Sequence, residues 1–299
     1  MKMQDFLREQ TSKGVVSVSP MPSSEELAAF YADSYYQETP SKTYSTHYSE
    51  DELAHRVLRA ELILFALKKV GLKNDSQPSF LEIGCGEGFL LKAAKEYGYE
   101  VRGVDFSDYG IQNYHPELID HIEVGDAYQI LQQIFVDQHH RFDVCVMQNV
   151  LEHVIDPEDL LHKVKQIMSP GGVVVITVPN DFSRIQAKLM DEGMIENEYW
   201  FQPPQHLHYF NVDTINSFVG HCGYSVVDAF ADFPIDFFLF HSGSNYVKDS
   251  AQGKDAHKAR ITLDLLLAER GVAVYHQLCQ ALTACGAGRN VTVLLTAMS

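Results

Sequence analysis

Short apolar runs alternate with amphipathic stretches through the middle of the chain. Five runs have the length and the polar flanks that are typical of buried strands. These runs are residues 80–83, 101–104, 121–124, 142–147 and 173–178. Helical patterns fit between them and begin near Phe89, Tyr109, Tyr128 and Pro157. Strands that alternate with helices, without hairpin turns, predict an α/β fold whose parallel sheet is covered by helices on both faces.

The segments on either side of this alternation are less regular. Residues 1–50 are polar and rich in tyrosine, which is typical of an arm or a lid rather than a core domain. From Glu50 to Val70, apolar residues recur at steps of three and four, which predicts an amphipathic helix that ends at Gly71. Towards the C-terminus we expect helices over 213–222 and 256–285 and strands over 224–230 and 290–297.

A glycine-rich turn joins the first predicted core strand to the helix that follows. It reads Gly84-Cys85-Gly86-Glu87-Gly88. Glycine lets the backbone turn sharply and approach a ligand closely, where a Cβ would clash. A turn of this kind between a strand and a helix N-terminus is typical of a nucleotide site. A nicotinamide-dinucleotide fingerprint would place its third glycine where this chain has Phe89, so the spacing disfavours an NAD-binding oxidoreductase.

The turn resembles the first motif of class I S-adenosylmethionine (SAM)-dependent methyltransferases. That motif is an acidic residue followed by G-x-G-x-G, which Glu82, Gly84, Gly86 and Gly88 match. The resemblance implies that these residues and Cys85 bind SAM and its product S-adenosylhomocysteine. It also implies the family's fold, a doubly wound, Rossmann-like sheet of seven mostly parallel strands.

Two acidic residues after later strands extend the resemblance. Asp105 ends the second strand, where the family has a carboxylate that accepts hydrogen bonds from both ribose hydroxyls, and Phe106 is expected to pack on the adenine. Asp126 and the backbone of Ala127 follow the third strand, where the family contacts the adenine amine. The carboxyl ends of neighbouring parallel strands meet at one edge of the sheet, so we expect these residues to converge.

Further segments match in order over about a hundred residues of the chain. Residues 142–154 are similar to the fourth motif of the family, so Gln148 at the strand end is expected to face the methionine moiety. Residues 169–172 are similar to the proline-glycine-glycine turn before the fifth strand. In related enzymes an arm closes over the cofactor, which makes Tyr36 a further cofactor candidate. We therefore divide the chain into an N-terminal arm and helical lid (1–75), a SAM-binding core (76–230), and a helical insertion with the final strand (231–299).

Three histidines are candidates for a catalytic base, which the reaction requires if the acceptor is a hydroxyl. His206 and His208 point in opposite directions if their segment is extended, so one is expected to face the substrate and the other to be structural. The segment is similar to one that borders the acceptor site in small-molecule methyltransferases. His153 either takes part in chemistry or supports the loop under the cofactor, and Glu152 has the same two interpretations.

The charge balance bears on the partner. The formal net charge is −17, from 40 acidic and 23 basic residues, which disfavours nucleic acid. An RNA 2'-O-methyltransferase is the alternative, because Glu152-His153 with later histidines faintly resembles metal-bound enzymes of that kind. Their pattern has a carboxylate where this chain has Asn149, and none of the five cysteines forms a C-x-x-C pair, so we expect no metal.

The remaining expectations concern the substrate and the compartment. The N-terminus has no signal-peptide core and no apolar run is long enough to cross a bilayer, so we expect a cytoplasmic protein without a membrane partner. The expected acceptor is a small molecule, with a sugar or nucleotide-sugar of bacterial surface-glycan synthesis as the first hypothesis. A homodimer is compatible with the sequence.

Overall fold

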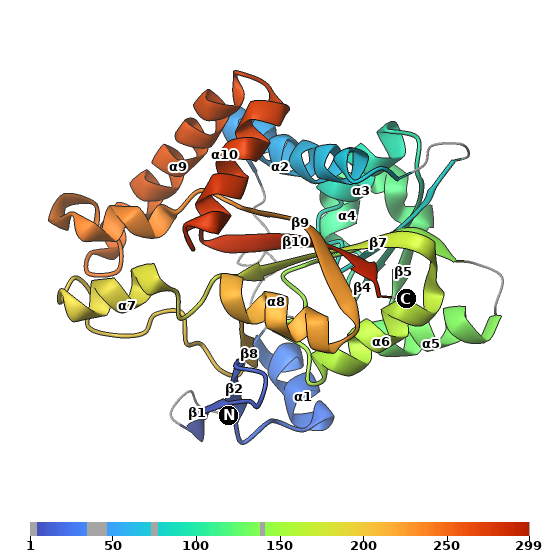
Figure 1. Cartoon of the computed structure of the whole chain (residues 1–299), viewed down its shortest axis with the longest axis horizontal. Coiled ribbons are helices and arrows are strands. Elements are labelled where there is room, and N and C mark those ends of the chain that lie inside the picture. Colours follow the sequence, from blue (N-terminus) through green and yellow to red (C-terminus); the bar gives the residue numbers. More distant parts are fainter. Residues whose placement is uncertain (1–4, 35–46, 73–76, 138–140, 299) are drawn as a thin grey trace.

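The expected core strands lie side by side in one sheet. The computed structural model describes residues 5–34, 47–72, 77–137 and 141–298. The strands of this sheet are β3 (Ser79–Ile83), β4 (Glu100–Asp105), β5 (Ile122–Val124), β6 (Phe142–Gln148), β7 (Met168–Pro179), β9 (Tyr224–Ala231) and β10 (Asn290–Ala297). They pair in the order β5-β4-β3-β6-β7-β10-β9 (Figure 1). The predicted α/β class with a seven-stranded sheet is confirmed.

The direction of the strands fixes where the functional edge lies. β3 runs parallel to β4 and β6, β5 is parallel to β4, and β7 is parallel to β6. Only β10 is reversed, and its residue Asn290 pairs with Pro179 at the end of β7. The carboxyl ends of the six parallel strands and the start of β10 therefore share one edge, which is where α/β sheets bind ligands.

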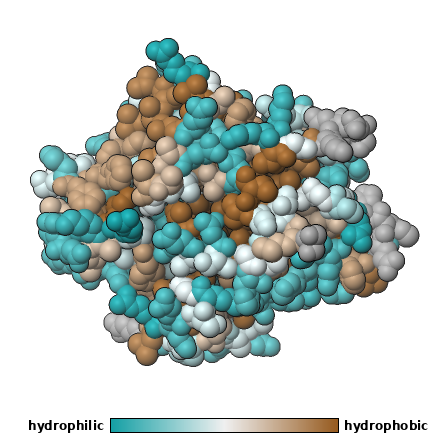
Figure 2. All heavy atoms as spheres, in the orientation of Figure 1, coloured by the Kyte–Doolittle hydropathy of each residue, from teal (hydrophilic) through white to brown (hydrophobic). Residues whose placement is uncertain are grey.

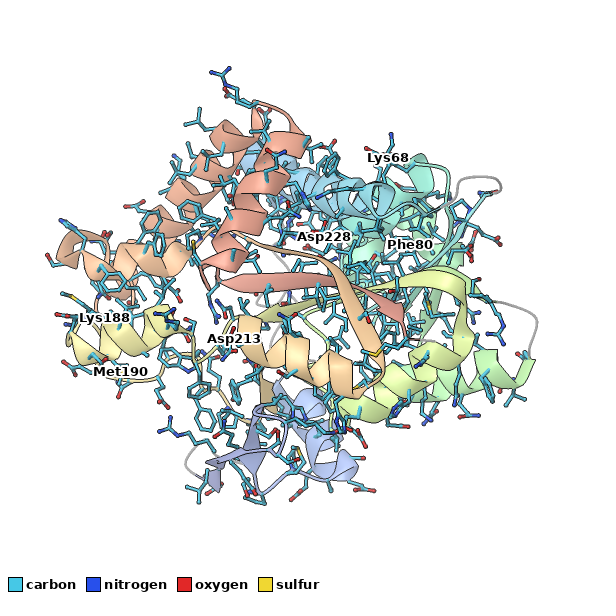
Figure 3. The ribbon with its side chains drawn as sticks, in the orientation of Figure 1. Lys68, Phe80, Lys188, Met190, Asp213 and Asp228 are labelled. Carbon is cyan, nitrogen blue, oxygen red and sulfur yellow. The ribbon has the colours of Figure 1, made fainter. Side chains whose placement is uncertain are left out.

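Helices cover both faces of the sheet (Figure 1). One face carries α2 (Glu50–Lys69), α3 (Phe89–Glu96) and α10 (Val272–Ala284), and the other carries α5 (Ala127–Asp137), α6 (Pro157–Ile167) and α8 (Val212–His221). Side chains of β6 alternate between the two layers, with Val144 and Val146 packed on the first and Cys145 and Met147 on the second. Phe80 of β3 is fully buried in the first layer (Figure 3).

The helix expected from residue 50 has the ends that the sequence indicates. The Ser49 hydroxyl accepts a hydrogen bond from the Glu52 backbone, and the Glu52 carboxylate accepts one from the Ser49 backbone, which forms a capping box. The helix ends before Gly71, whose φ of 81° is in the left-handed region.

The N-terminal arm contains strands that the sequence analysis did not predict. β1 (Leu7–Gln10) and β2 (Val16–Ser19) form a hairpin, which pairs with the short strand β8 (His208–Tyr209). The helix α1 (Ser24–Ser34) follows the hairpin. Because the pairing partner lies some 190 positions later in the chain, the local pattern contained no signal for it. The arm thus holds the segment around His206 in place.

The C-terminal region also differs in one respect. The helical run expected over 256–285 is divided into α9 (Gly253–Ala268) and α10, because Gly271 adopts a φ of 98° between them. The shorter elements in the described ranges include α4 (Tyr109–Tyr114), α7 (Arg184–Asp191) and 3₁₀ turns at 116–121, 235–240, 242–244 and 250–252.

Apolar side chains gather on the surface over α10 (Figure 2). Val274 and Leu278 of this helix and Leu266 and Leu267 of α9 are exposed. The expected homodimer stays a prediction. No helix in the described ranges combines the length and the apolar content that a membrane span needs.

Candidate active site

The glycine-rich turn between β3 and α3 has an unusual backbone. Gly84, Gly86 and Gly88 all adopt φ in the left-handed region, at 73°, 54° and 79°. A Cβ added at Gly88 would lie 2.4 Å from Ile111 Cδ1, and one at Gly84 would lie 2.7 Å from Val150 Cγ2. Any other residue would therefore be strained and would overlap its neighbours. The glycines of the turn thus bring backbone without a Cβ to the functional edge of the sheet, where Gly84 is exposed.

Asp105 lies beside this turn, at the end of β4. Its Oδ2 accepts a hydrogen bond of 2.8 Å from the Gly86 backbone, and its Oδ1 accepts one of 3.2 Å from the Ser107 backbone. Burial raises the pKa of this carboxyl, and the two N–H groups oppose the rise by stabilising the charge. The structure thus brings Asp105 to the glycine turn, as the sequence predicts. The neighbouring Phe106 is 62% exposed, so its ring is accessible to a ligand.

Asp126 and Ala127 occupy the next strand end. The Asp126 Oδ1 accepts a hydrogen bond from the Gln129 backbone at 3.0 Å and so caps α5, which begins at Ala127. The Gly125 backbone donates to the Asp105 carbonyl at 2.9 Å, which ties this loop to the end of β4. Asp105, Asp126 and the glycine turn therefore line adjacent positions on the same edge.

Glu82 contributes a buried carboxylate behind the turn. Its Oε1 accepts a hydrogen bond of 3.1 Å from Gln148 Nε2, and its Oε2 has no hydrogen-bond partner in the described part of the chain. Burial, with a contribution from the charge of Asp105, raises the pKa of Glu82 to about 8. A ligand cation would satisfy the unpartnered oxygen, and the ammonium group of SAM has that chemistry. Together with the uncovered glycine backbone, this orphaned oxygen fits the cofactor that the sequence implies.

Cys85 within the turn is buried, and burial raises the pKa of its thiol. A protonated thiol is unreactive, so we expect no chemical role for the Cys85 side chain. Only the backbone of Cys85, as part of the turn, bears on cofactor binding.

Three residues that the sequence analysis missed anchor the turn. The Glu87 carboxylate is buried; it accepts a hydrogen bond from Tyr48 Oη at 2.6 Å and forms an ion pair with Arg56 Nη1 at 2.6 Å. The Arg56 guanidinium also lies 3.9 Å from the centre of the Tyr48 ring. These contacts link the start of α2 to the turn. Glu87 was visible as the acidic residue between two glycines, whereas nothing in the local pattern indicated Arg56. Tyr36, the predicted arm residue, lies outside the described residues.

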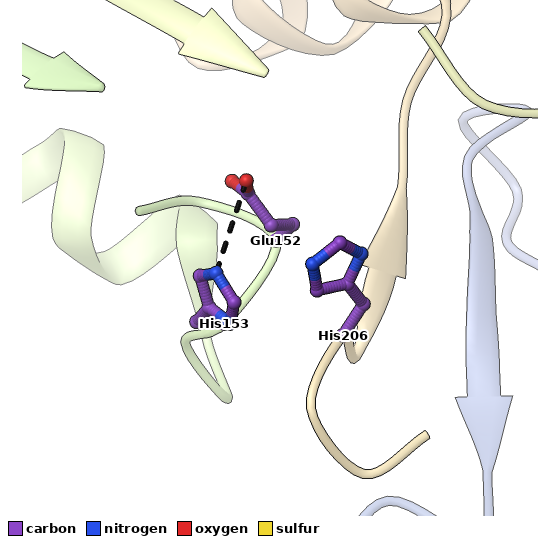
Figure 4. A group of neighbouring side chains, drawn as sticks. All are labelled: Glu152, His153 and His206. Atoms are coloured by element: carbon purple, nitrogen blue, oxygen red, sulfur yellow. Dashed lines mark ion pairs between the residues drawn. The ribbon is translucent and has the colours of Figure 1, made fainter. Parts of the chain in front are cut away.

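A second group of polar side chains lies where the loop after β6 meets the segment around His206 (Figure 4). The side chains of Glu152, His153 and His206 each direct one potential ligand atom to a common space, and these atoms lie within 4.8 Å of one another. The imidazoles of His153 and His206 are nearly perpendicular, with ring centres 4.8 Å apart. We call this group the Glu152 cluster.

The backbone holds the Glu152 cluster together. The Glu152 carbonyl accepts hydrogen bonds from the backbone of Leu207 at 2.7 Å and of His208 at 3.2 Å. The His153 Nδ1–H donates to the Gln205 carbonyl at 2.6 Å. The loop after β6 and the segment around His206 are thus joined at several points, which fixes the three side chains relative to one another.

Burial sets the protonation of the Glu152 cluster. It raises the pKa of Glu152 to about 8, with the charge of Asp181 adding to the effect, and it lowers the pKa of His153. Burial and the neighbouring His153 lower the pKa of His206 to about 3. Both imidazoles are neutral at pH 7. A group with so low a pKa accepts a proton poorly, so this geometry weakens the case for His206 as the general base, which stays a prediction.

His208 lies in a different environment from His206. The Ser17 hydroxyl donates to its Nδ1 at 2.8 Å, and its Nε2–H donates to the Ile155 carbonyl at 3.2 Å. Both ring nitrogens are used within the fold, and the side chain is buried. The histidine that faces away from the Glu152 cluster thus joins β8 to β2, and a catalytic role for His208 is not supported by this geometry.

A polar cavity adjoins Gln148 on the side of α2 and α9. Arg59, Thr177, Arg260 and Asn290 are among its lining residues. Asp264 and Asp232 also line it. Asp264 is bonded to His55 and Tyr275, and Asp232 accepts hydrogen bonds from the Arg289 backbone and the Asn290 side chain. The Nε of Arg260 is buried without a hydrogen-bond partner in the described ranges. The cavity therefore places an arginine with an unpartnered N–H close to the cofactor edge.

Comparisons with known proteins show the family to which the chain is similar. The family model of the methyltransferase domain matches residues 45–229. Ubiquinone biosynthesis O-methyltransferase of Caulobacter sp. (strain K31) is 30% identical over 101 residues, which is 33% of this chain and 40% of that protein. The Salmonella arizonae (strain ATCC BAA-731 / CDC346-86 / RSK2980) enzyme of the same name is 30% identical over 128 residues, 42% of this chain and 51% of that protein. The matched segments thus span about half or less of the length of these curated relatives.

A solved structure extends the likeness to nearly the whole chain. The plantazolicin methyltransferase BamL, in complex with a desmethylPZN analog and SAH, matches with a TM-score of 0.53 at 15% identity and covers 92% of this chain and 97% of that one. At that identity the likeness shows the fold. Because the family model covers more than half of the chain, including the glycine turn and Asp105, the chain belongs to the methyltransferase-domain family, that is, to the class I SAM-dependent methyltransferases.

Proposed function

We propose that the protein transfers the methyl group of SAM to an oxygen atom of a small-molecule acceptor. The observation that carries this proposal is the position of Asp105, whose carboxylate lies against the bare glycine turn at the carboxyl edge of the sheet. The names of the curated relatives, which are O-methyltransferases, support oxygen as the acceptor atom.

The described residues divide the binding of the cofactor among them. We assign to Asp105 the hydrogen bonds from the ribose hydroxyls, to Phe106 the packing on the adenine, and to Asp126 with the Ala127 backbone the contact with the adenine edge. When ionised, the Glu82 carboxylate carries a negative charge that attracts the ammonium group of SAM. Gln148 orients this carboxylate. When bound, SAM supplies a methyl group on a positively charged sulfur, which is a strong electrophile. The protein's main tasks are therefore to align the acceptor and to exclude water.

The acceptor is expected between the Glu152 cluster and the cavity beside Gln148. The cluster follows the end of β6 by four residues, so it lies on the same edge as the cofactor residues. A hydroxyl that attacks a methyl group must lose its proton, and polar groups near the attacking oxygen assist that loss. We assign this task to the Glu152 cluster.

The cavity favours an acceptor that carries negative charge. Arg59 and Arg260 line it, while its carboxylates Asp232 and Asp264 already have partners within the fold. An arginine with an unpartnered buried N–H is suited to a phosphate or carboxylate. This supports the hypothesis of a nucleotide-sugar, which bears a diphosphate beside several hydroxyls.

The experiment is a methyl-transfer assay with purified protein and a panel of acceptors. The panel pairs nucleotide-sugars with the matching neutral sugars, and adds a phenolic carboxylate and a single-stranded RNA. Formation of S-adenosylhomocysteine with anionic hydroxyl compounds supports the proposal, and Arg260→Gln should then raise KM for these acceptors without changing SAM affinity. Turnover confined to amines, to neutral compounds or to RNA would refute the proposed acceptor class.

A further inference from the structure

The Glu152 carboxylate has no visible compensation for its burial. The residue is 1% exposed, and neither oxygen has a hydrogen-bond partner in the described part of the chain. A buried carboxylate without partners is costly, and native proteins rarely retain one without a reason. Protonation would remove the charge but would leave a buried O–H without an acceptor.

Nearby groups do not supply that compensation. His153 Nε2 lies 3.9 Å from Glu152 Oε1, which is too long for a hydrogen bond. The cationic Arg289 is already bonded to Asp181 at 2.7 Å. The Nδ1 of His206 is likewise buried and without a partner in the described ranges. Two unsatisfied residues thus face one space together with His153.

We propose that the Glu152 cluster binds a divalent transition-metal cation. Two imidazoles and one carboxylate form a donor set that Zn²⁺, Fe²⁺ or Co²⁺ accepts, whereas Mg²⁺ and Ca²⁺ prefer oxygen donors alone. The inference departs from the sequence-based expectation of no metal, which rested on Asn149 and on the absence of paired cysteines.

The surroundings of His153 have the form of a metal ligand's support. The bond from its Nδ1–H to the Gln205 carbonyl fixes the tautomer in which Nε2 carries the lone pair, and Nε2 is the atom that faces Glu152. Donor atoms lie about 2.0–2.2 Å from a bound ion, so small side-chain rotations would bring the three ligands together. The polar contacts between the two loops hold the backbone in place without an ion.

Three protein ligands leave coordination positions open for a substrate oxygen. A hydroxyl bound to the cation would release its proton to water at a lower pH than it does in solution, and its oxygen would keep the electron pair. This role rests on the proposed function, whereas the binding of the cation does not. It also accounts for why two weakly basic histidines surround the expected acceptor.

Metal binding is tested on the full chain after treatment with a chelator. Zn²⁺ uptake is measured by equilibrium dialysis, and the visible absorption of added Co²⁺ reports its ligands. We expect one equivalent per chain and a rise in Tm on addition of Zn²⁺. Loss of a residue that only supports a ligand weakens metal affinity about 10- to 100-fold. Glu152→Gln and His206→Asn, which remove ligands, should weaken it at least as much.

The controls separate binding from folding and from catalysis. His162→Asn replaces an exposed histidine of α6 and should bind Zn²⁺ like the wild type. SAM affinity should be the same in all variants, and if Glu152→Gln does not fold, His206→Asn decides. Wild-type protein that takes up no cation, or ligand variants that bind it as tightly as the wild type, would overturn the proposal. Full turnover by metal-free protein would refute only the catalytic role of the cation. Protein that binds the cation but methylates no oxygen would refute only the proposed function.

Discussion

The substitution Asp105→Asn tests the cofactor site with the least disturbance of the fold. Asparagine has the same shape and keeps one oxygen that accepts the Gly86 N–H. It removes the charge that strengthens hydrogen bonds to the two ribose hydroxyls. A bond to a charged group contributes about 1.5–3 kcal/mol and a neutral one about 1 kcal/mol. Over two bonds the expected loss is therefore about 1–4 kcal/mol, which corresponds to an increase in Kd of about 5- to 700-fold.

Calorimetric titration with S-adenosylhomocysteine measures this loss. Asp108→Asn is the matched control, because Asp108 lies three positions away and makes no capping bond to α4. It should bind like the wild type, and both variants should unfold within about 2 kcal/mol of the wild type. If Asp105→Asn kept its affinity to within about threefold, or about 0.7 kcal/mol, Asp105 would not contact the ribose and the assigned site would be wrong.

Three further outcomes follow from the structure. Gly88→Ala should abolish cofactor binding and lower Tm more than Gly98→Ala, because Gly98 has a similar positive φ but nothing within 4 Å of an added Cβ; equal effects would show that contact with Ile111 is unimportant. Because burial raises the pKa of Glu82 to about 8 from 4.5, the wild type should lose unfolding free energy as pH rises through that interval. In urea unfolding measured across this pH range, Glu82→Gln should reduce the decrease in unfolding free energy by about 2–5 kcal/mol. An unchanged pH profile would contradict the burial argument. His208→Ala should cost about 1–3 kcal/mol of stability with no change in SAM affinity, and weakened SAM binding in a stable variant would argue against its structural role.

The core of the fold followed from local patterns. Strands such as β3 and β6 are mostly apolar, because parallel strands are buried on both faces. The helices between them have the apolar spacing of one covered side. Asp105 could be placed as well, since the carboxyl ends of neighbouring parallel strands converge on one edge. These features depend only on the order of elements along the chain.

Other features depend on contacts between distant segments. The hairpin β1-β2 gains its third strand from residues 208–209, and no local pattern reports a partner so far away. Arg56 lies on a helix surface where an arginine is unremarkable until Glu87 is brought to it. The Glu152 cluster is of the same kind, because His206 reaches Glu152 only through the docking of two loops. Sequence order indicated its members separately but did not show that they meet.

The central claim is that the glycine turn and Asp105 form an adenosyl site, and a binding measurement tests it most directly. Purified protein titrated with S-adenosylhomocysteine and, separately, with NAD should bind the first at one molecule per chain and show no saturable binding of the second. Saturable binding of NAD, or no binding of either S-adenosylhomocysteine or SAM by folded protein, would contradict the account.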